Sequence, residues 1–113
     1  MTAKELNQLY YLNKEIDLYE REMRRLERSG IENPDEKIRL DDTLRVLGGL
    51  REDAAVKRMR ILEYIRGIDD SYIRQILYWR NIRCKSWAAV GLKMNIPEDT
   101  VKKAYYRFIR EKK

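Results

Sequence analysis

The sequence has no histidine, a single cysteine and few residues that interrupt helices. Its 113 residues include two prolines and five glycines, so we expect no flexible linker or low-complexity tail. Cys84 has no second cysteine to pair with, which excludes an internal disulfide and is typical of a reducing compartment. One cysteine without histidine also excludes the usual zinc cages of Cys and His within one chain.

Long apolar runs are missing as well. No stretch of about 18 apolar residues occurs, and residues 1–14 lack the apolar-then-small pattern of a signal peptide. We therefore expect a cytoplasmic protein that does not contact a membrane. The sequence also lacks a glycine-rich phosphate loop, a cluster of metal ligands and a nucleophile beside a base, so we expect neither a cofactor nor enzymatic activity.

Charge is abundant and unevenly distributed. Charged residues make up 39% of the chain and the formal net charge is +6. In residues 1–68, 14 Lys and Arg balance 14 Asp and Glu, whereas residues 69–113 hold 11 Lys and Arg against five Asp and Glu. The whole excess lies in the last 45 residues, and a basic segment joined to a neutral one is typical of a module that binds a polyanion.

Residues 1–68 are predicted to form a helical arm. Thr2 and Glu5 have the spacing of a capping box that starts a helix over about 2–28. Apolar residues then recur at alternating spacings of three and four, as in a coiled-coil seam. They are Leu9, Leu12, Ile16, Tyr19, Met23 and Leu26. Ser29 and Gly30 end this helix.

A second helix is predicted over about 42–66, after a connector at 31–40 in which Asn33-Pro34-Asp35 signals a turn. Gly48-Gly49 leaves two alternatives: the helix starts after these glycines, or they permit a close helix contact. The two helices predict an antiparallel hairpin whose apolar stripe packs against itself or against a second copy. The fold class is therefore all-α, with a helical hairpin or coiled-coil arm before a C-terminal helical domain.

Residues 69–113 carry the signs of a helix-turn-helix. Asp69-Asp70-Ser71 can cap a helix over about 71–83. Ser86 can cap a short helix over 87–94, and Asn95 tolerates the left-handed conformation of a tight turn. Pro97 suits the first turn of a last helix over about 97–111. A short helix, a tight turn and a longer helix are the parts of a helix-turn-helix.

The last helix has one apolar and one cationic side. Val101, Ala104, Tyr105 and Phe108 share a sector that should pack inward. The predicted DNA-binding residues of the other side are Asp99, Thr100, Lys102, Lys103, Tyr106, Arg107 and Arg110, with Lys113 on the same side. They could enter a major groove and reach phosphates or guanine edges. Arg80, Arg83 and Lys85, near the start of the short helix, are predicted to contact phosphates.

The segment from Ser86 to Val101 resembles the helix-turn-helix of sigma-factor region 4. Val90-Gly91 matches its aliphatic-small pair, Asn95-Ile96 its turn, and Thr100-Val101 the opening of its recognition helix. Asn95 replaces the usual Gly, and Pro97 replaces a Ser that could contact DNA. The wider layout is similar to small phage and prophage proteins of Gram-positive bacteria, including late transcription regulators. The resemblance implies DNA binding and contact with RNA polymerase.

Three functions compete on the sequence. The first is a transcriptional regulator that binds double-stranded DNA through the last helix, while the arm forms a homodimer or contacts RNA polymerase. The second is a small terminase-like subunit for DNA packaging, which also joins a helix-turn-helix to an oligomerising helical region. The third is a protein-binding module in which the helix-turn-helix never touches DNA.

Overall fold

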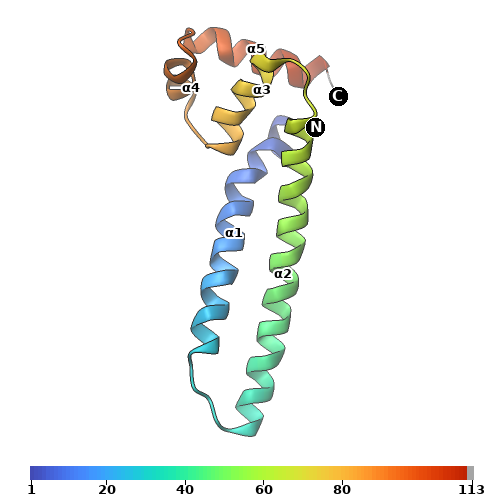
Figure 1. The fold of residues 1–113 in the computed structure, drawn as a ribbon, viewed down its shortest axis with the longest axis vertical. Coiled ribbons are helices and arrows are strands. Elements are labelled where there is room, and N and C mark those ends of the chain that lie inside the picture. Colours follow the sequence, from blue (N-terminus) through green and yellow to red (C-terminus); the bar gives the residue numbers. More distant parts are fainter. Residues whose placement is uncertain (112–113) are drawn as a thin grey trace. The chain divides into compact units, whose positions relative to one another are not determined.

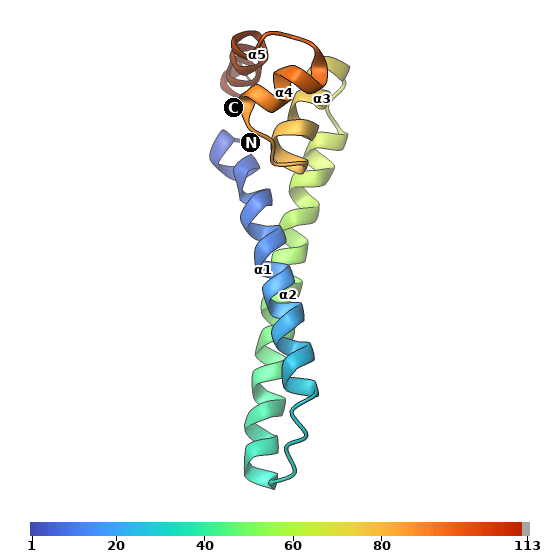
Figure 2. The same cartoon turned by 90° about the vertical axis from the view of Figure 1, so that its left-hand side faces the viewer.

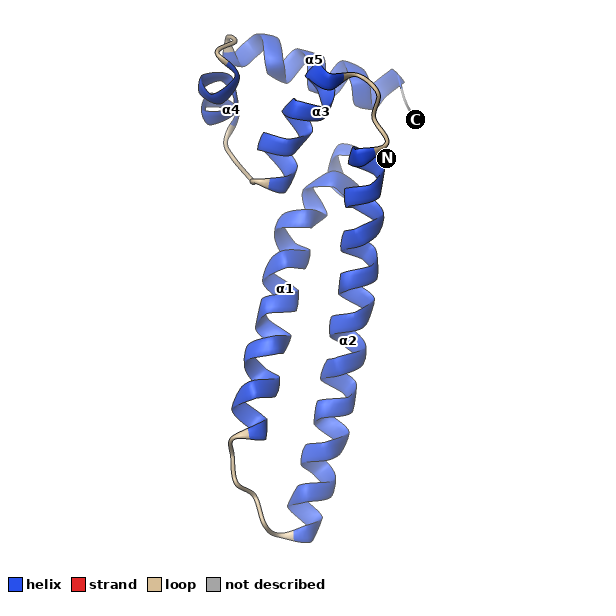
Figure 3. Cartoon of the chain, viewed as in Figure 1, coloured by secondary structure: helices blue, strands red, loops and turns tan. Residues whose placement is uncertain are grey.

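The computed structural model describes residues 1–111, and every regular element in that range is helical (Figure 3). The elements are α1 (Ala3–Glu27), α2 (Pro34–Arg66), α3 (Ser71–Leu77), η1 (Tyr78–Ile82), α4 (Trp87–Met94) and α5 (Glu98–Glu111). The predicted all-α class with a long helix pair is confirmed. The chain divides into two compact units, one of residues 12–58 and one that joins residues 1–11 to Met59 and the residues after it.

Residues 12–58 form a helical hairpin in which parts of α1 and α2 run antiparallel (Figure 1). The seam predicted for the first helix faces inward, since Leu12 and Ile16 are buried. Farther along, Tyr19, Met23, Leu26, Leu44 and Leu47 are only half-buried. Arg51 and Glu20 pair across the hairpin with 2.8 Å between Nη2 and Oε1. A two-helix unit has one apolar seam. The half of that seam toward the connector between α1 and α2, here called the outer seam, is only partly covered by the chain itself.

The first helix begins and ends at the predicted signals. The Glu5 amide donates to the Thr2 hydroxyl at 3.1 Å, and the Thr2 amide donates to the Glu5 carboxylate at 3.4 Å. At the other end, the Ser29 hydroxyl donates to the Leu26 carbonyl at 2.7 Å, and Gly30 has φ +65°. These contacts satisfy backbone groups that the ends of a helix leave unpaired.

The predicted start of the second helix was wrong, because α2 begins at Pro34 and not near residue 42. Asn33 caps it: its Oδ1 accepts from the amides of Asp35 at 2.9 Å and Glu36 at 3.3 Å. Asn-Pro is a turn signal, but it is equally an N-cap followed by the proline favoured at the first helical position. The predicted connector at 31–40 therefore shrinks to the residues before Pro34.

Gly48 and Gly49 lie inside α2, which continues through them. Both sequence alternatives fail within the chain, because the helix starts before the glycines and no atom beyond the adjacent residues and the local helix backbone lies within 4 Å of a β-carbon built on either. Nothing in the chain requires glycine at these two positions.

The second unit contains the C-terminal helices together with the beginning of α1 and the end of α2. Within it α5 packs against α3 and α4 (Figure 2). Its most deeply buried side chains are Leu6, Leu9, Ile76, Leu77, Asn81, Val90, Val101 and Tyr105. Ile61 and Ile65 of α2 are buried as well, so the core draws on every helix in this unit, including α1.

The helix predicted over 71–83 is helical but not uniform. Asp70 caps α3 by accepting from the amides of Tyr72 at 2.9 Å and Ile73 at 3.3 Å. After Leu77 the chain continues as one π-helical turn, η1, closed by the Arg83 amide donating to the Tyr78 carbonyl at 2.9 Å. A π turn widens the helix by one residue and is often found at functional sites. None of the helices in residues 1–111 is long and apolar enough to cross a membrane.

Candidate nucleic-acid interface

The arrangement of the short helix α4, the turn after it and the longer helix α5 follows from local hydrogen bonds around α4. The Ser86 hydroxyl accepts from the Ala89 amide at 3.2 Å and begins the helix. Asn95 ends it in the left-handed region, with φ 55° and ψ 43°. The Ile96 amide then donates to the Gly91 carbonyl at 3.0 Å. The predicted cap, short helix and turn residue are all confirmed.

The inward face of α5 is the predicted one, extended by one residue. Val101 and Tyr105 are buried, Ala104 and Phe108 are half-buried, and Ile109, which was not among the predicted inward residues, is buried with them. Ile109 lies four residues after Tyr105, so it belongs to the same stripe by helical spacing. α5 is therefore held to the rest of the unit by a continuous apolar stripe along its length.

The outward face of α5 carries every described residue of the predicted set. Asp99, Thr100, Lys102, Lys103, Tyr106, Arg107 and Arg110 are all exposed. Lys113 lies outside the described residues. The structure brings these side chains onto one helix face, with four cations within nine residues of sequence.

Cations in the two long helices and cations on α5 differ in their pairing. The ion pairs found among residues 1–111 all lie within α1 and α2, as in Arg25 with Glu22 at 2.9 Å. In the same range, no ion pair involves a cation of α5. The cations of α5 are thus not held in ion pairs with carboxylates of the described chain, so they are available to an external anion.

The three predicted phosphate contacts upstream are not equivalent. Arg80 is half-buried; its Nη1 donates to the Lys85 carbonyl at 3.0 Å and its Cζ lies 4.7 Å from the centre of the Trp87 ring. Arg83 is exposed and makes only a 3.5 Å contact with the Tyr78 hydroxyl and a 5.9 Å approach to the Trp79 ring. Lys85 is half-buried. The guanidinium of Arg80 is held by contacts within the chain, whereas the side chain of Arg83 is exposed to solvent.

An aromatic cluster supports the junction of α4 and α5. Trp87 and Tyr105 meet edge to face with centroids 4.9 Å apart, and Tyr106 lies 5.2 Å from Tyr105 and 6.1 Å from Trp87. Tyr106 remains 45% exposed, so one part of its ring packs in the cluster while another faces solvent. Edge-to-face pairs of this kind stabilise a fixed arrangement of the rings.

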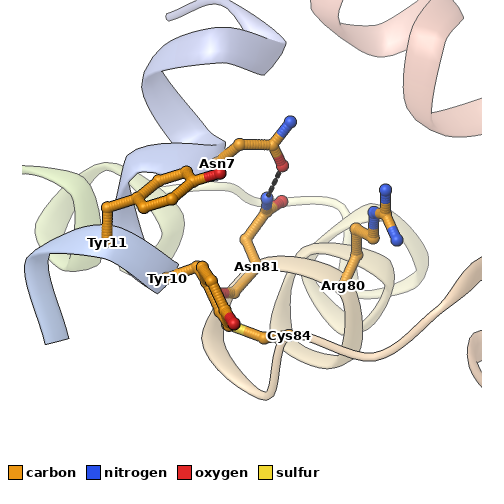
Figure 4. A pocket seen from close by; sticks show the side chains of 6 residues that line it. All are labelled: Asn7, Tyr10, Tyr11, Arg80, Asn81 and Cys84. Carbon is orange, nitrogen blue, oxygen red and sulfur yellow. Dashed lines mark hydrogen bonds between the residues drawn. The ribbon is translucent and has the colours of Figure 1, made fainter. Parts of the chain in front are cut away.

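Two asparagines join α1 to η1, although neither was a candidate from the sequence. Asn81 is 2% exposed, and its Nδ2 donates to the Asn7 Oδ1 at 3.0 Å (Figure 4). A shallow cavity of about 280 Å³ lies beside the pair, lined also by Tyr10, Arg80 and Cys84. The contact spans 74 positions of sequence, so no local pattern could have revealed it.

Tyr105 is the buried titratable group of this unit. Burial raises the pKa of its phenol; the Asn81 amide beside it acts in the opposite direction. Neither the Tyr105 hydroxyl nor the Asn81 Oδ1 has a hydrogen-bond partner within the described residues. The phenol is thus held as a packing group more than as an acid or base.

No protein-family model, no curated protein and no solved structure matches the chain.

Proposed function

We propose that the protein is a DNA-binding transcriptional regulator whose helix-turn-helix, α4 and α5, places α5 in the major groove. The observation that carries this proposal is the exposed cationic face of α5, whose Lys and Arg make no ion pair within residues 1–111, whereas five arginines of α1 and α2 do. Cations that neutralise phosphates release condensed counterions, which supplies much of the affinity for DNA.

The side chains of α5 have distinct roles in this proposal. Lys102, Lys103, Arg107 and Arg110 reach phosphates or guanine edges. Thr100 and Asp99 lie at the start of α5, where recognition helices contact base edges, and a carboxylate there can accept from cytosine N4. Arg83 adds a phosphate contact from the end of η1.

The arm completes the proposal. The half-buried outer seam of the hairpin fits a homodimer or contact with RNA polymerase, because either partner would cover apolar side chains that the chain leaves partly open. The resemblance of residues 86–101 to sigma-factor region 4, and of the layout to phage and prophage regulators, supports a cytoplasmic transcriptional role. A dimer would read two half-sites about one helical turn apart.

The test is selection of binding sites from randomised duplex DNA at two salt concentrations. The triple variant Lys102→Ala/Lys103→Ala/Arg107→Ala should lose the enriched sequence and show a smaller decrease of affinity with salt. A matched control removes three paired cations of the arm, Arg21→Ala/Arg25→Ala/Arg45→Ala. Both variants have a net charge three lower than the parent's +6, so a difference between them reports the α5 face and not total charge.

Each other outcome supports a different function. Salt-dependent retention without an enriched sequence, together with a many-membered ring in solution, would favour the DNA-packaging subunit. Absence of binding at both salt concentrations would overturn the proposal and leave the protein-binding module. Equal loss of DNA affinity in the α5 triple variant and in the arm control would contradict the assignment of DNA binding to the outward face of α5, even if the parent protein binds DNA.

A further inference from the structure

A groove lies away from the turn between α4 and α5, between the end of α2, the start of α3 and the second half of α5. It encloses about 870 Å³. Its floor is apolar, formed by the buried Ile68 and Ile73 with the half-buried Ala104 and Phe108. Tyr64 and Tyr72, also half-buried, line it. An apolar floor open to solvent on this scale is typical of a surface that receives another side chain or helix.

The rim of the groove is acidic within the most basic part of the chain. Glu63, Asp69, Asp70 and Glu111 line it, against the single cation Arg107. Glu63 is paired with the exposed Arg66 at 3.3 Å, and Asp70 caps α3, but the carboxylates of Asp69 and Glu111 make no ion pair or side-chain hydrogen bond within residues 1–111. Two carboxylates at the rim are thus unpaired there.

The helix ends at this place add to the negative potential. α2 ends beside the groove, at Arg66 and Gly67, and the C-terminal end of a helix carries partial negative charge. The opposite charge at the start of the short α3 is offset by the Asp70 carboxylate that caps it. An acidic rim repels nucleic acid, so this groove cannot share the ligand of the α5 face.

We propose that the groove is a docking site for an amphipathic helix of a protein partner that carries Lys or Arg beside its apolar residues. Apolar side chains of such a helix fill the floor between Ile73 and Phe108, and its cations lie against Asp69 and Glu111. Charge complementarity of this kind selects the partner and its orientation. Arg107 lines the groove and also belongs to the cationic face of α5, so the two surfaces meet at this residue.

The experiment uses the full chain and a labelled amphipathic peptide of about 14 Leu and Lys residues with leucines at helical spacing. Binding is measured by fluorescence anisotropy, and the site by amide NMR shifts. We expect the shifts to gather at Tyr72, Ala104 and Phe108. A control peptide with Glu in place of every Lys should bind much more weakly, because the acidic rim repels its carboxylates.

Double substitutions test whether the carboxylates at the rim of the groove contribute to peptide binding. Asp69→Asn/Glu111→Gln should weaken peptide binding by about tenfold. The matched control Glu52→Gln/Asp53→Asn removes two exposed carboxylates of the hairpin and should leave binding unchanged. Lys112→Ala/Lys113→Ala, altering the two residues after Glu111, should bind as tightly as the parent; tighter binding would make the chain's own C-terminus the occupant and overturn the proposal.

Other results of the same experiments would overturn the proposed docking site. Equal binding of the Leu-Lys and Leu-Glu peptides, or shifts confined to the hairpin, would overturn the proposal. So would concentration-dependent shifts at the same residues without peptide, which would make a second copy of the chain the occupant. DNA binding of Asp69→Asn/Glu111→Gln, measured separately, should persist, so that failure of the groove and failure of the proposed DNA function are told apart.

Discussion

A β-carbon built on Gly91 would lie 2.8 Å from the carbonyl oxygen of Ile96. It would also lie 3.2 Å from the amide nitrogen of Glu98. Both neighbours are backbone atoms, which cannot rotate away as a flexible side chain would. Gly91 therefore sets how closely α4 approaches the start of α5, and with it the presentation of the exposed face of α5.

Replacing Gly91 with Ala should lower the free energy of unfolding by about 1–3 kcal/mol, the usual cost of overpacking. This is opposite to the gain that Ala normally gives inside a helix. Urea unfolding followed by circular dichroism measures it. The matched control is Gly49→Ala, where nothing lies within 4 Å, and it should raise stability by about 0.5–1 kcal/mol. Stabilisation by both substitutions would show that the α4–α5 turn has room for a methyl group.

Asn95 should be replaceable by Gly but not by a β-branched residue. Its φ of 55° lies in the left-handed region, which costs most L-residues roughly 1–2 kcal/mol. Asn95→Gly should therefore change stability by less than about 0.5 kcal/mol, whereas Asn95→Val should lower it by about 1–2 kcal/mol or more. Thermal unfolding of both variants checks this. Equal stability of the two would mean that the turn adopts another backbone conformation.

Alkaline pH should destabilise the second unit through Tyr105. Because burial raises the pKa of this phenol in the folded chain, the unfolded chain loses its proton first as pH rises above about 10. The contribution of Tyr105 to stability is therefore complete below that pH and declines above it. Tyr105→Phe should flatten the decline, with a change of no more than about 1 kcal/mol at neutral pH because the hydroxyl has no hydrogen-bond partner in the described chain.

The control for Tyr105 is Tyr11→Phe, which removes a phenol that is 61% exposed. Unfolding midpoints measured from neutral to alkaline pH should fall in this control as they do in the parent. An alkaline decline that persists unchanged in Tyr105→Phe would assign the effect to other groups.

Sequence patterns predicted the parts of the fold that depend on neighbours in the chain. The Ser86 cap, the left-handed Asn95 and the inward face of α5 each follow from local chemistry within a few residues. The start of α2 was misplaced because Asn33-Pro34 signals a turn and a helix start equally well. A pattern with two structural meanings is resolved only by the conformation and packing of the residues around it.

Other features depend on contacts that the sequence does not display. The Asn7–Asn81 hydrogen bond joins residues 74 positions apart, and the π turn of η1 appears where Asn81 is buried. Arg80 and Arg83 look alike in sequence, three residues apart and both near the start of α4. Only their surroundings separate an arginine stacked on Trp87 from one that faces solvent.

The different surroundings of Arg80 and Arg83 predict different effects when each is replaced by Met: one on stability, the other on DNA binding. Arg80→Met loses its hydrogen bond to the Lys85 carbonyl and its place over the Trp87 ring, so stability should fall by about 1–2 kcal/mol. Arg83→Met should change stability by less than about 0.5 kcal/mol. Instead it should weaken DNA binding uniformly across sequences and reduce the slope of affinity against salt by about one charge.

Both arginine variants lose one positive charge and keep a side chain of similar length, so each serves as the control for the other. Urea unfolding, followed by tryptophan fluorescence, gives the stability, and DNA binding is compared at temperatures where both remain folded. If Arg80→Met stays as stable as the parent yet loses salt-dependent binding, then Arg80 leaves Trp87 to contact phosphate in the complex. In that case the cation–π contact belongs to the free protein alone.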